Sequence, residues 1–478
     1  MKQSGARPLV GPVSSIDTST KEQIEMTAAD RAQYERMTQT PIPKLITKLS
    51  IPTVASMLVT ALYNTADTFY VSHLGNSATA AVGVNFALMA IIQALGFMYG
   101  MGSGSLVSRL MGERKNEEAE MVASSGILIA LLSGLCLTVG GLFFINPLLD
   151  LLGATETILP YARAYAKYIL FAAPIMSASF VLNNILRAEG HATLAMFGIT
   201  AGGVLNLVLD PILIFGFDMG IAGAAIATMA SQTTSCLVLL SFYLQNKSFL
   251  HPSLRKVSRR LITYWDISRT GLSSFFRQGL AAIATATLNS AAGIYGDAAI
   301  AAMSVVGRIF LFINAFIVGL GQGYQPVAGF NFGAGKYTRV RESFWFVLKV
   351  SIVITGSMAA LCGIGAYQVM DLFGDDPEML RIGTFALRAQ CVSLLLQPCS
   401  VVANMTFQAV GQTWRAAFLA CCRQGIYFFP LINILPHFWG LVGVQLTQAS
   451  SDLLSCLTCI PFLMLFLRKL PIEDLPDS

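Results

Sequence analysis

Twelve long apolar segments, separated by short polar loops, follow one another along almost all of the 478 residues. Only 12% of the residues are charged, about half of what a soluble protein carries. A bilayer core needs about twenty apolar residues per helix, and only helices or closed barrels satisfy their own backbone in lipid. We therefore predict an all-α integral membrane protein with twelve transmembrane helices. The expected spans are residues 42–72, 77–110, 121–145, 159–186, 192–215, 220–246, 262–294, 298–332, 341–369, 383–410, 416–435 and 440–467.

The loop charges predict an orientation. If both ends of the chain lie in the cytoplasm, the inner loops contain nearly all loop Lys and Arg residues. The outer loops are then acidic or neutral apart from Arg381. This asymmetry is what the positive-inside rule requires, and it favours an even number of spans. The first forty residues contain no apolar signal region, so we expect a cytoplasmic tail there, mostly without structure, with a possible interfacial helix over 28–37.

The two halves of the chain resemble each other. A shift of 221 residues places 74–81 on 295–302, and it also places Ala188 and Gly190 on Ala409 and Gly411. Six spans per repeat is an even number, so the halves share one orientation and are related by an axis along the membrane normal. We predict a tail (1–41), an N-terminal lobe (42–246), a cytoplasmic linker (247–261), a C-terminal lobe (262–468) and a second cytoplasmic tail (469–478).

Two acidic residues lie within spans of the first half, where an ionisable group is costly and by default functional. These are Asp67 and Asp210, and Asn206 shares a helix face with Asp210 because the two are four residues apart. Oxygen ligands suit Na⁺, and a carboxylate away from water holds a proton more readily. The matching positions of the second half are Leu288 and Phe429, so the asymmetry indicates a coupling role for the first lobe.

Other polar residues at membrane depth receive a structural interpretation. The second half carries basic residues and one acid in its spans. They are Arg277, Arg308, Lys349, Arg388, Arg423 and Asp452. The nine cysteines lie in apolar segments, where Cys acts as a small hydrophobic residue. Pro52 lies early in the first span and is expected to bend it.

The twelve spans, together with the stretches 206–218, 220–228 and 187–190, resemble the MATE (multidrug and toxic compound extrusion) family, in particular its DinF-like branch. The resemblance implies export of amphipathic or cationic organic compounds, driven by Na⁺ or H⁺ entry. It also implies a cation site in the N-terminal lobe and a bend at Pro52. Residue by residue, that site falls on Asp67, Tyr165, Asn206, Asp210 and Thr228, with Asp67, Asn206, Asp210 and Thr228 as the Na⁺ ligands.

These observations favour an antiporter that works by alternating access in a bacterial inner membrane. We expect a monomer without a cofactor other than its coupling ion, and without a nucleic-acid partner. Two alternatives remain open: a flippase for a lipid-linked precursor, favoured by Arg277, Arg308 and Arg423, or a dedicated metabolite exporter. A membrane-embedded enzyme is disfavoured because the sequence contains no HExxH motif or phosphate-binding loop.

Overall fold

The computed structural model describes residues 28–374 and 376–475, and within them every regular element is a helix. Residues 1–27 of the predicted N-terminal tail lie outside this range. The elements of the first half are α1 (Ala28–Gln39), α2 (Ile42–Ser72), α3 (Asn76–Gly112), α4 (Asn116–Phe143), α5 (Ile145–Leu151), α6 (Leu159–Ala188), α7 (Ala192–Pro211) with a π-helical turn (Ile212–Gly216), and α8 (Gly220–Leu244).

A short 3-10 turn, Leu254–Lys256, lies between the two halves. The second half repeats the order of long and short helices. Its elements are α9 (Leu261–Gly293), α10 (Asp297–Gly333), α11 (Tyr337–Ile364), α12 (Ala366–Asp371), α13 (Pro377–Leu394), α14 (Gln397–Ala409), α15 (Thr413–Cys421) with a π-helical turn (Cys422–Ile426), α16 (Phe428–Trp439) and α17 (Leu441–Lys469).

The described helices account for twelve spans. Ten are long and apolar enough to cross a bilayer, and α13 with α14 forms an eleventh that bends by 48°. The twelfth is α9, which is 33 residues long and packs against α3 and α15. Its apolar character is diluted by Asp266, Arg269 and Arg277, and neighbouring helices rather than lipid cover much of a span of this kind.

Three spans differ in detail from the sequence-based expectation. The predicted tenth span, 383–410, is a broken pair that begins earlier, at Pro377. The fifth and eleventh spans each contain a π-helical turn, which hydropathy does not reveal. The first span is an unbroken helix through Pro52, so the structure contains no helix break at that residue.

The internal repeat is present in the backbone geometry. Gly75 and Gly296 precede the 37-residue helices α3 and α10 with φ of 103° and 101°, a conformation that favours glycine. The Asn183 amide donates to the Ala195 carbonyl at 2.8 Å, and the Asn404 amide donates to the Ala416 carbonyl at 2.5 Å. Both bonds join residues twelve apart at matching places, so the two halves fold in the same way.

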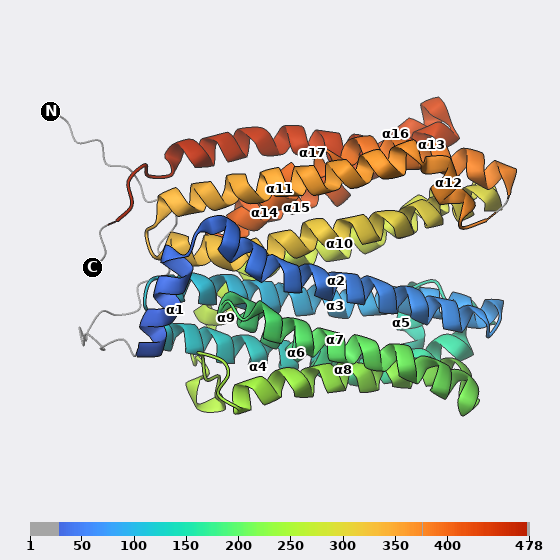
Figure 1. The fold of residues 1–478 in the computed structure, drawn as a ribbon. Coiled ribbons are helices and arrows are strands. Elements are labelled where there is room, and N and C mark those ends of the chain that lie inside the picture. Colours follow the sequence, from blue (N-terminus) through green and yellow to red (C-terminus); the bar gives the residue numbers. More distant parts are fainter. Residues whose placement is uncertain (1–27, 375, 476–478) are drawn as a thin grey trace.

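The two halves form two lobes that lie side by side, with α2–α8 in one and α10–α17 in the other (Figure 1). The lobes meet where α2 packs against α10 and α3 packs against α9. Glycine permits this approach: a Cβ at Gly319 of α10 would lie 2.6 Å from the Val54 Cα of α2. The helix α1 and the last turn of α17 lie at the same end of the bundle (Figure 1), which we call the terminal end.

Hydrogen bonds join the lobes in the half of the bundle next to the terminal end. The Thr53 hydroxyl donates to the Gly319 carbonyl at 2.7 Å, and the Gln325 amide donates to the Ser105 hydroxyl at 2.9 Å. The Arg187 guanidinium donates to the Gln322 side chain across the same interface. The lobes are therefore closed against each other at the terminal end.

The helix α1 lies across this closed end and contacts both lobes. Gln33 donates to the Glu189 carbonyl of the first lobe. Arg339 of the second lobe donates to the Thr40 carbonyl at 2.6 Å, just beyond the end of α1. Met37 is fully buried between these contacts. The interfacial helix expected near 28–37 thus exists as a helix over 28–39 that packs on protein.

Candidate functional site

Polar side chains spaced four residues apart occur on three neighbouring helices of the first lobe. This spacing puts both members of a pair on one helix face, and α7 packs against both α2 and α8. The pairs are Tyr63 and Asp67 in α2, Asn206 and Asp210 in α7, and Thr228 and Gln232 in α8.

These faces converge on one buried cluster. Asp67 and Asp210 lie close enough for their charges to interact. Tyr165 of α6 lies beside both carboxylates and beside Thr228. Asp67 is 4% exposed, and Tyr165 and Asp210 are fully buried. The structure therefore brings together all five residues that the sequence analysis placed at a cation site.

Several oxygens of the cluster have no donor. The Asn206 amide donates to Asp210 Oδ1 at 3.2 Å, whereas Asp67 Oδ1, Asn206 Oδ1 and Asp210 Oδ2 are buried without a hydrogen-bond partner. No Lys, Arg or His of the described chain forms an ion pair with either carboxylate. Buried carboxylates without a counter-charge are costly, so the arrangement fits a bound cation that supplies positive charge.

The donor set suits Na⁺ or a proton better than a transition metal. Its ligating atoms are carboxylate, amide and hydroxyl oxygens, which are hard ligands. Among the described residues, no group of three or more His, Cys, Asp or Glu side chains could hold a metal ion. Two carboxylates in mutual contact also favour sharing of a proton, because like charges at short distance cannot both ionise freely.

Sequence reasoning missed two residues of the cluster. Tyr63 lies beside Asp67 and Gln232, and both Tyr63 and Gln232 carried a signal, since each is four residues from a predicted site residue on its own helix. The choice of Tyr165 over its neighbours is explained by burial, because Tyr165 is fully buried and Tyr161 is 46% exposed.

A cavity of about 280 Å³ lies between the lobes, lined by parts of α2, α3 and α10. These parts belong to the half of each helix far from the terminal end, so the lobes are separated there and closed at the other end. The Tyr165 hydroxyl lies 3.9 Å from Met89 Sδ, and Met89 lines the cavity. Polar side chains in its wall are Asn64, Thr65, Thr68 and Gln93.

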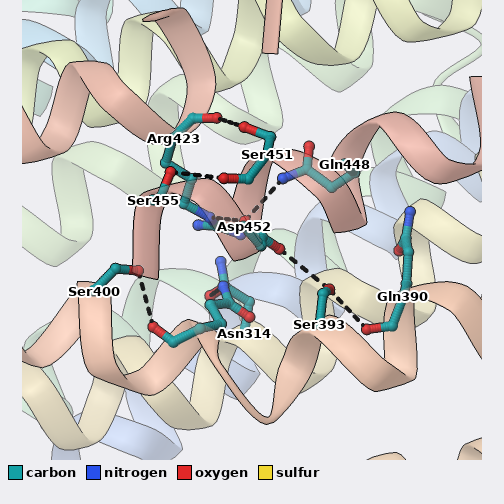
Figure 2. A network of polar contacts seen from close by, with 10 residues as sticks. Asn314, Gln390, Ser393, Ser400, Arg423, Gln448, Ser451, Asp452 and Ser455 are labelled. Atoms are coloured by element: carbon teal, nitrogen blue, oxygen red, sulfur yellow. Dashed lines mark hydrogen bonds and ion pairs between the residues drawn. The ribbon is translucent and has the colours of Figure 1, made fainter. Parts of the chain in front are cut away.

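The second lobe contains a buried polar network around Asp452 (Figure 2). Asp452 Oδ1 accepts from Arg423 Nε at 2.6 Å and from Gln448 at 3.2 Å, and Oδ2 accepts from the Ser393 hydroxyl at 3.3 Å. Ser451 donates to the Arg423 carbonyl. Both carboxylate oxygens are thus occupied, which agrees with the structural interpretation of this pair.

The other basic residues of the second lobe have different surroundings. Arg388 Nε donates to the Gly363 carbonyl at 3.3 Å. Arg277 lies near Arg423, and its Nη1 is buried without a hydrogen-bond partner. Arg308 lines the cavity between the lobes, a position that the sequence did not reveal.

Comparison with known proteins agrees with this architecture. The MatE family model matches the chain twice, over residues 52–212 and 274–432, so each lobe contains one copy. The multidrug export protein MepA of Staphylococcus saprophyticus is 27% identical over 425 residues, which covers 89% of this chain and 94% of MepA.

Solved structures are similar over most of their length. A multidrug resistance MATE family transporter in an outward-facing conformation matches with a TM-score of 0.86 and 29% identity, over 91% of this chain and 98% of that one. A MATE in the bent conformation matches with a TM-score of 0.85 and 29% identity, over 92% and 98%. With both halves of the chain matched by the family model, this multi-pass membrane protein belongs to the MATE family of transporters.

Proposed function

We propose that this protein is a cation-coupled antiporter that exports small amphipathic compounds, in which Na⁺ or H⁺ binds at Asp67 and Asp210. One observation carries the proposal: buried oxygens of Asp67, Asn206 and Asp210 lack partners in one cluster. A scaffold acid would be expected to have its oxygens occupied, as those of Asp452 are. The name of the staphylococcal relative, a multidrug export protein, supports export of more than one compound.

The proposed orientation places the terminal end in the cytoplasm of a bacterial cell. The loops at that end contain most loop Lys and Arg residues, as expected for cytoplasmic loops. The cavity between the lobes then faces outward, and the cytoplasmic half is closed by contacts such as Thr53 to Gly319. This corresponds to the stage at which a compound leaves and a coupling cation enters from outside.

Two faces of α2 offer a route for coupling. Tyr63 and Asp67 face the buried cation cluster, whereas Asn64 and Thr68 face the cavity. Neutralising Asp67 and Asp210 removes their repulsion and lets α2 and α7 approach, which changes the cavity wall on the opposite face of α2. Pro52 supplies a soft point because its ring removes one backbone donor from the helix.

Transport in proteoliposomes tests the proposal. Dye efflux is measured under an imposed Na⁺ gradient and, separately, under an imposed pH gradient, for wild type and Asp210→Asn. We expect one gradient to drive wild type and the variant to be inactive. The matched control is Asp150→Asn, the same change at an exposed residue of the same lobe, which should transport normally. Normal gradient-driven efflux by Asp210→Asn would show that the coupling role is wrong.

A further inference from the structure

The cavity between the lobes carries a single formal charge, and that charge is positive. Arg308 of α10 contributes it, and the other lining residues are neutral. No Asp or Glu lines this cavity. Asp67, although it belongs to a lining helix, is buried on the other face of α2 beside Tyr63 and Tyr165. A compound in the cavity therefore meets Arg308 and no carboxylate.

Arg308 has no internal counter-charge. No carboxylate of the described residues lies within ion-pair distance of its guanidinium, and the side chain is exposed to the cavity. This distinguishes Arg308 from Arg423, which is paired with Asp452. A guanidinium is always charged and presents several fixed donors. At membrane depth it needs water or an anion as a partner.

The neutral wall of the cavity adds donors and an apolar surface. Within the described chain, the amides of Asn64 and Gln93 are not engaged by another residue, so their NH₂ groups are free to donate to a ligand. Phe86, Met89 and Leu311 supply an apolar surface. A site that combines one unpaired guanidinium, free amide donors and an apolar wall is complementary to a compound with an anionic group on an apolar body.

We infer that the exported compounds include small amphipathic anions, whose carboxylate, sulfonate or phosphate group binds Arg308 from within the cavity. This inference rests on the proposed export function and specifies its substrate class. It departs from the cationic cargo that the family resemblance implied, because a cation in the same position would be repelled by Arg308. A volume of about 280 Å³ suits a compound with one or two rings rather than a lipid with two acyl chains.

Binding of two probes with the same apolar body and opposite charge tests the inference. The probes are radiolabelled naphthalene-2-sulfonate and (2-naphthylmethyl)trimethylammonium. Equilibrium dialysis against the full chain in phosphatidylcholine nanodiscs, with empty nanodiscs as the blank, gives both dissociation constants. We expect wild type to bind the sulfonate at least tenfold more tightly, because charge is the main difference between the probes.

Three substitutions at Arg308 and one control sharpen the test. Arg308→Gln should bring the ratio of the two affinities close to one, Arg308→Glu should reverse the preference, and Arg308→Lys should keep it. The matched control is Arg388→Gln in the same lobe, outside the cavity, which should leave the ratio unchanged. A single symmetric peak in size-exclusion chromatography establishes that each variant is folded.

The outcomes separate this inference from the proposed function. The dialysis uses no ion gradient, so Asp210→Asn should lose coupled transport and still prefer the sulfonate. Tighter binding of the ammonium probe by wild type, equal binding of the two, binding of neither, or an unchanged preference in Arg308→Gln would overturn the inference. Arg308-dependent scrambling of fluorescent phosphatidylglycerol without binding of the sulfonate would assign the site to a lipid headgroup and would also overturn it.

Discussion

In the N-terminal lobe Asp67 and Asp210 are buried with oxygens that lack partners, whereas in the C-terminal lobe Asp452 is buried with both oxygens occupied. The two lobes share one backbone plan, as the matching bonds of Asn183 and Asn404 demonstrate. Duplication has therefore preserved helix packing while the buried polar residues diverged. The lobe with open acceptors is suited to binding a cation, and the lobe with a closed ion pair is suited to holding its own shape.

The positions of the acids sharpen this contrast. With a shift of 221 residues Asp452 of α17 falls on Ser231 of α8, which lies between Thr228 and Gln232 of the cation cluster. Corresponding regions of the two lobes thus contain acids in different places and with different partners. In the second lobe Arg423 supplies the positive charge that the first lobe would take from a coupling ion.

Replacement of Asp210 should have the largest effect on function. We expect Asp210→Asn to lower gradient-driven efflux by about 100-fold, equivalent to about 2.7 kcal/mol of lost coupling. The same change should raise the free energy of unfolding by about 1–3 kcal/mol, because it removes a buried charge without a partner. Proteoliposome efflux and thermal unfolding measure the two effects. An equal loss of efflux in a stably folded Asp452→Asn variant would contradict the contrast between the lobes.

Replacement of Asp452 should have the largest effect on stability. Asp452→Ala leaves the buried Arg423 guanidinium without its carboxylate, and breaking a buried pair in this way costs about 3–5 kcal/mol. Unfolding can be followed with a thiol-reactive dye, since the nine cysteines are free and four of them are buried.

The double variant Asp452→Ala, Arg423→Met provides the control for this effect. It removes both charges, so most of the lost stability should return. If the double variant were as unstable as Asp452→Ala alone, the pair would not be the reason for the destabilisation.

Removal of the Tyr165 hydroxyl should have a moderate effect. Tyr165→Phe takes one polar group from beside Asp67 and Thr228. A single hydrogen bond of this kind contributes about 1 kcal/mol, so we expect roughly a fivefold weaker apparent affinity for the coupling cation. The cation concentration that gives half-maximal efflux measures it. Tyr161→Phe, at an exposed residue of the same helix, should show no change, and an equal effect there would argue against Tyr165.

Replacement of Pro52 should have the smallest effect. Pro52→Ala restores a backbone donor in the middle of α2 and favours a straight, stiff helix. We expect efflux to slow by about two- to fivefold, equivalent to less than 1 kcal/mol, without loss of cation binding. Pro461→Ala, at an exposed proline inside α17, should leave the rate unchanged. A normal rate in Pro52→Ala would show that the bend at Pro52 is not used in transport.

Much of this protein follows from the sequence alone. Hydropathy identified the regions of the twelve spans because lipid imposes one simple requirement on composition. Self-comparison identified the repeat, since Gly75 and Gly296 must keep a positive φ. The i and i+4 spacing of Asn206 and Asp210 was enough to place both on one helix face.

Only the tertiary structure decided which faces meet. Hydropathy measures exposure to lipid and carries no information on the rotation of one helix against another, so Tyr63 and Gln232 were missed although each shares a face with a predicted residue. The same limit concealed the 48° bend between α13 and α14 and the ion pair between Arg423 and Asp452. It also concealed the position of Arg308 in the cavity, because an arginine within a span reads alike whether it faces a carboxylate, water or a substrate.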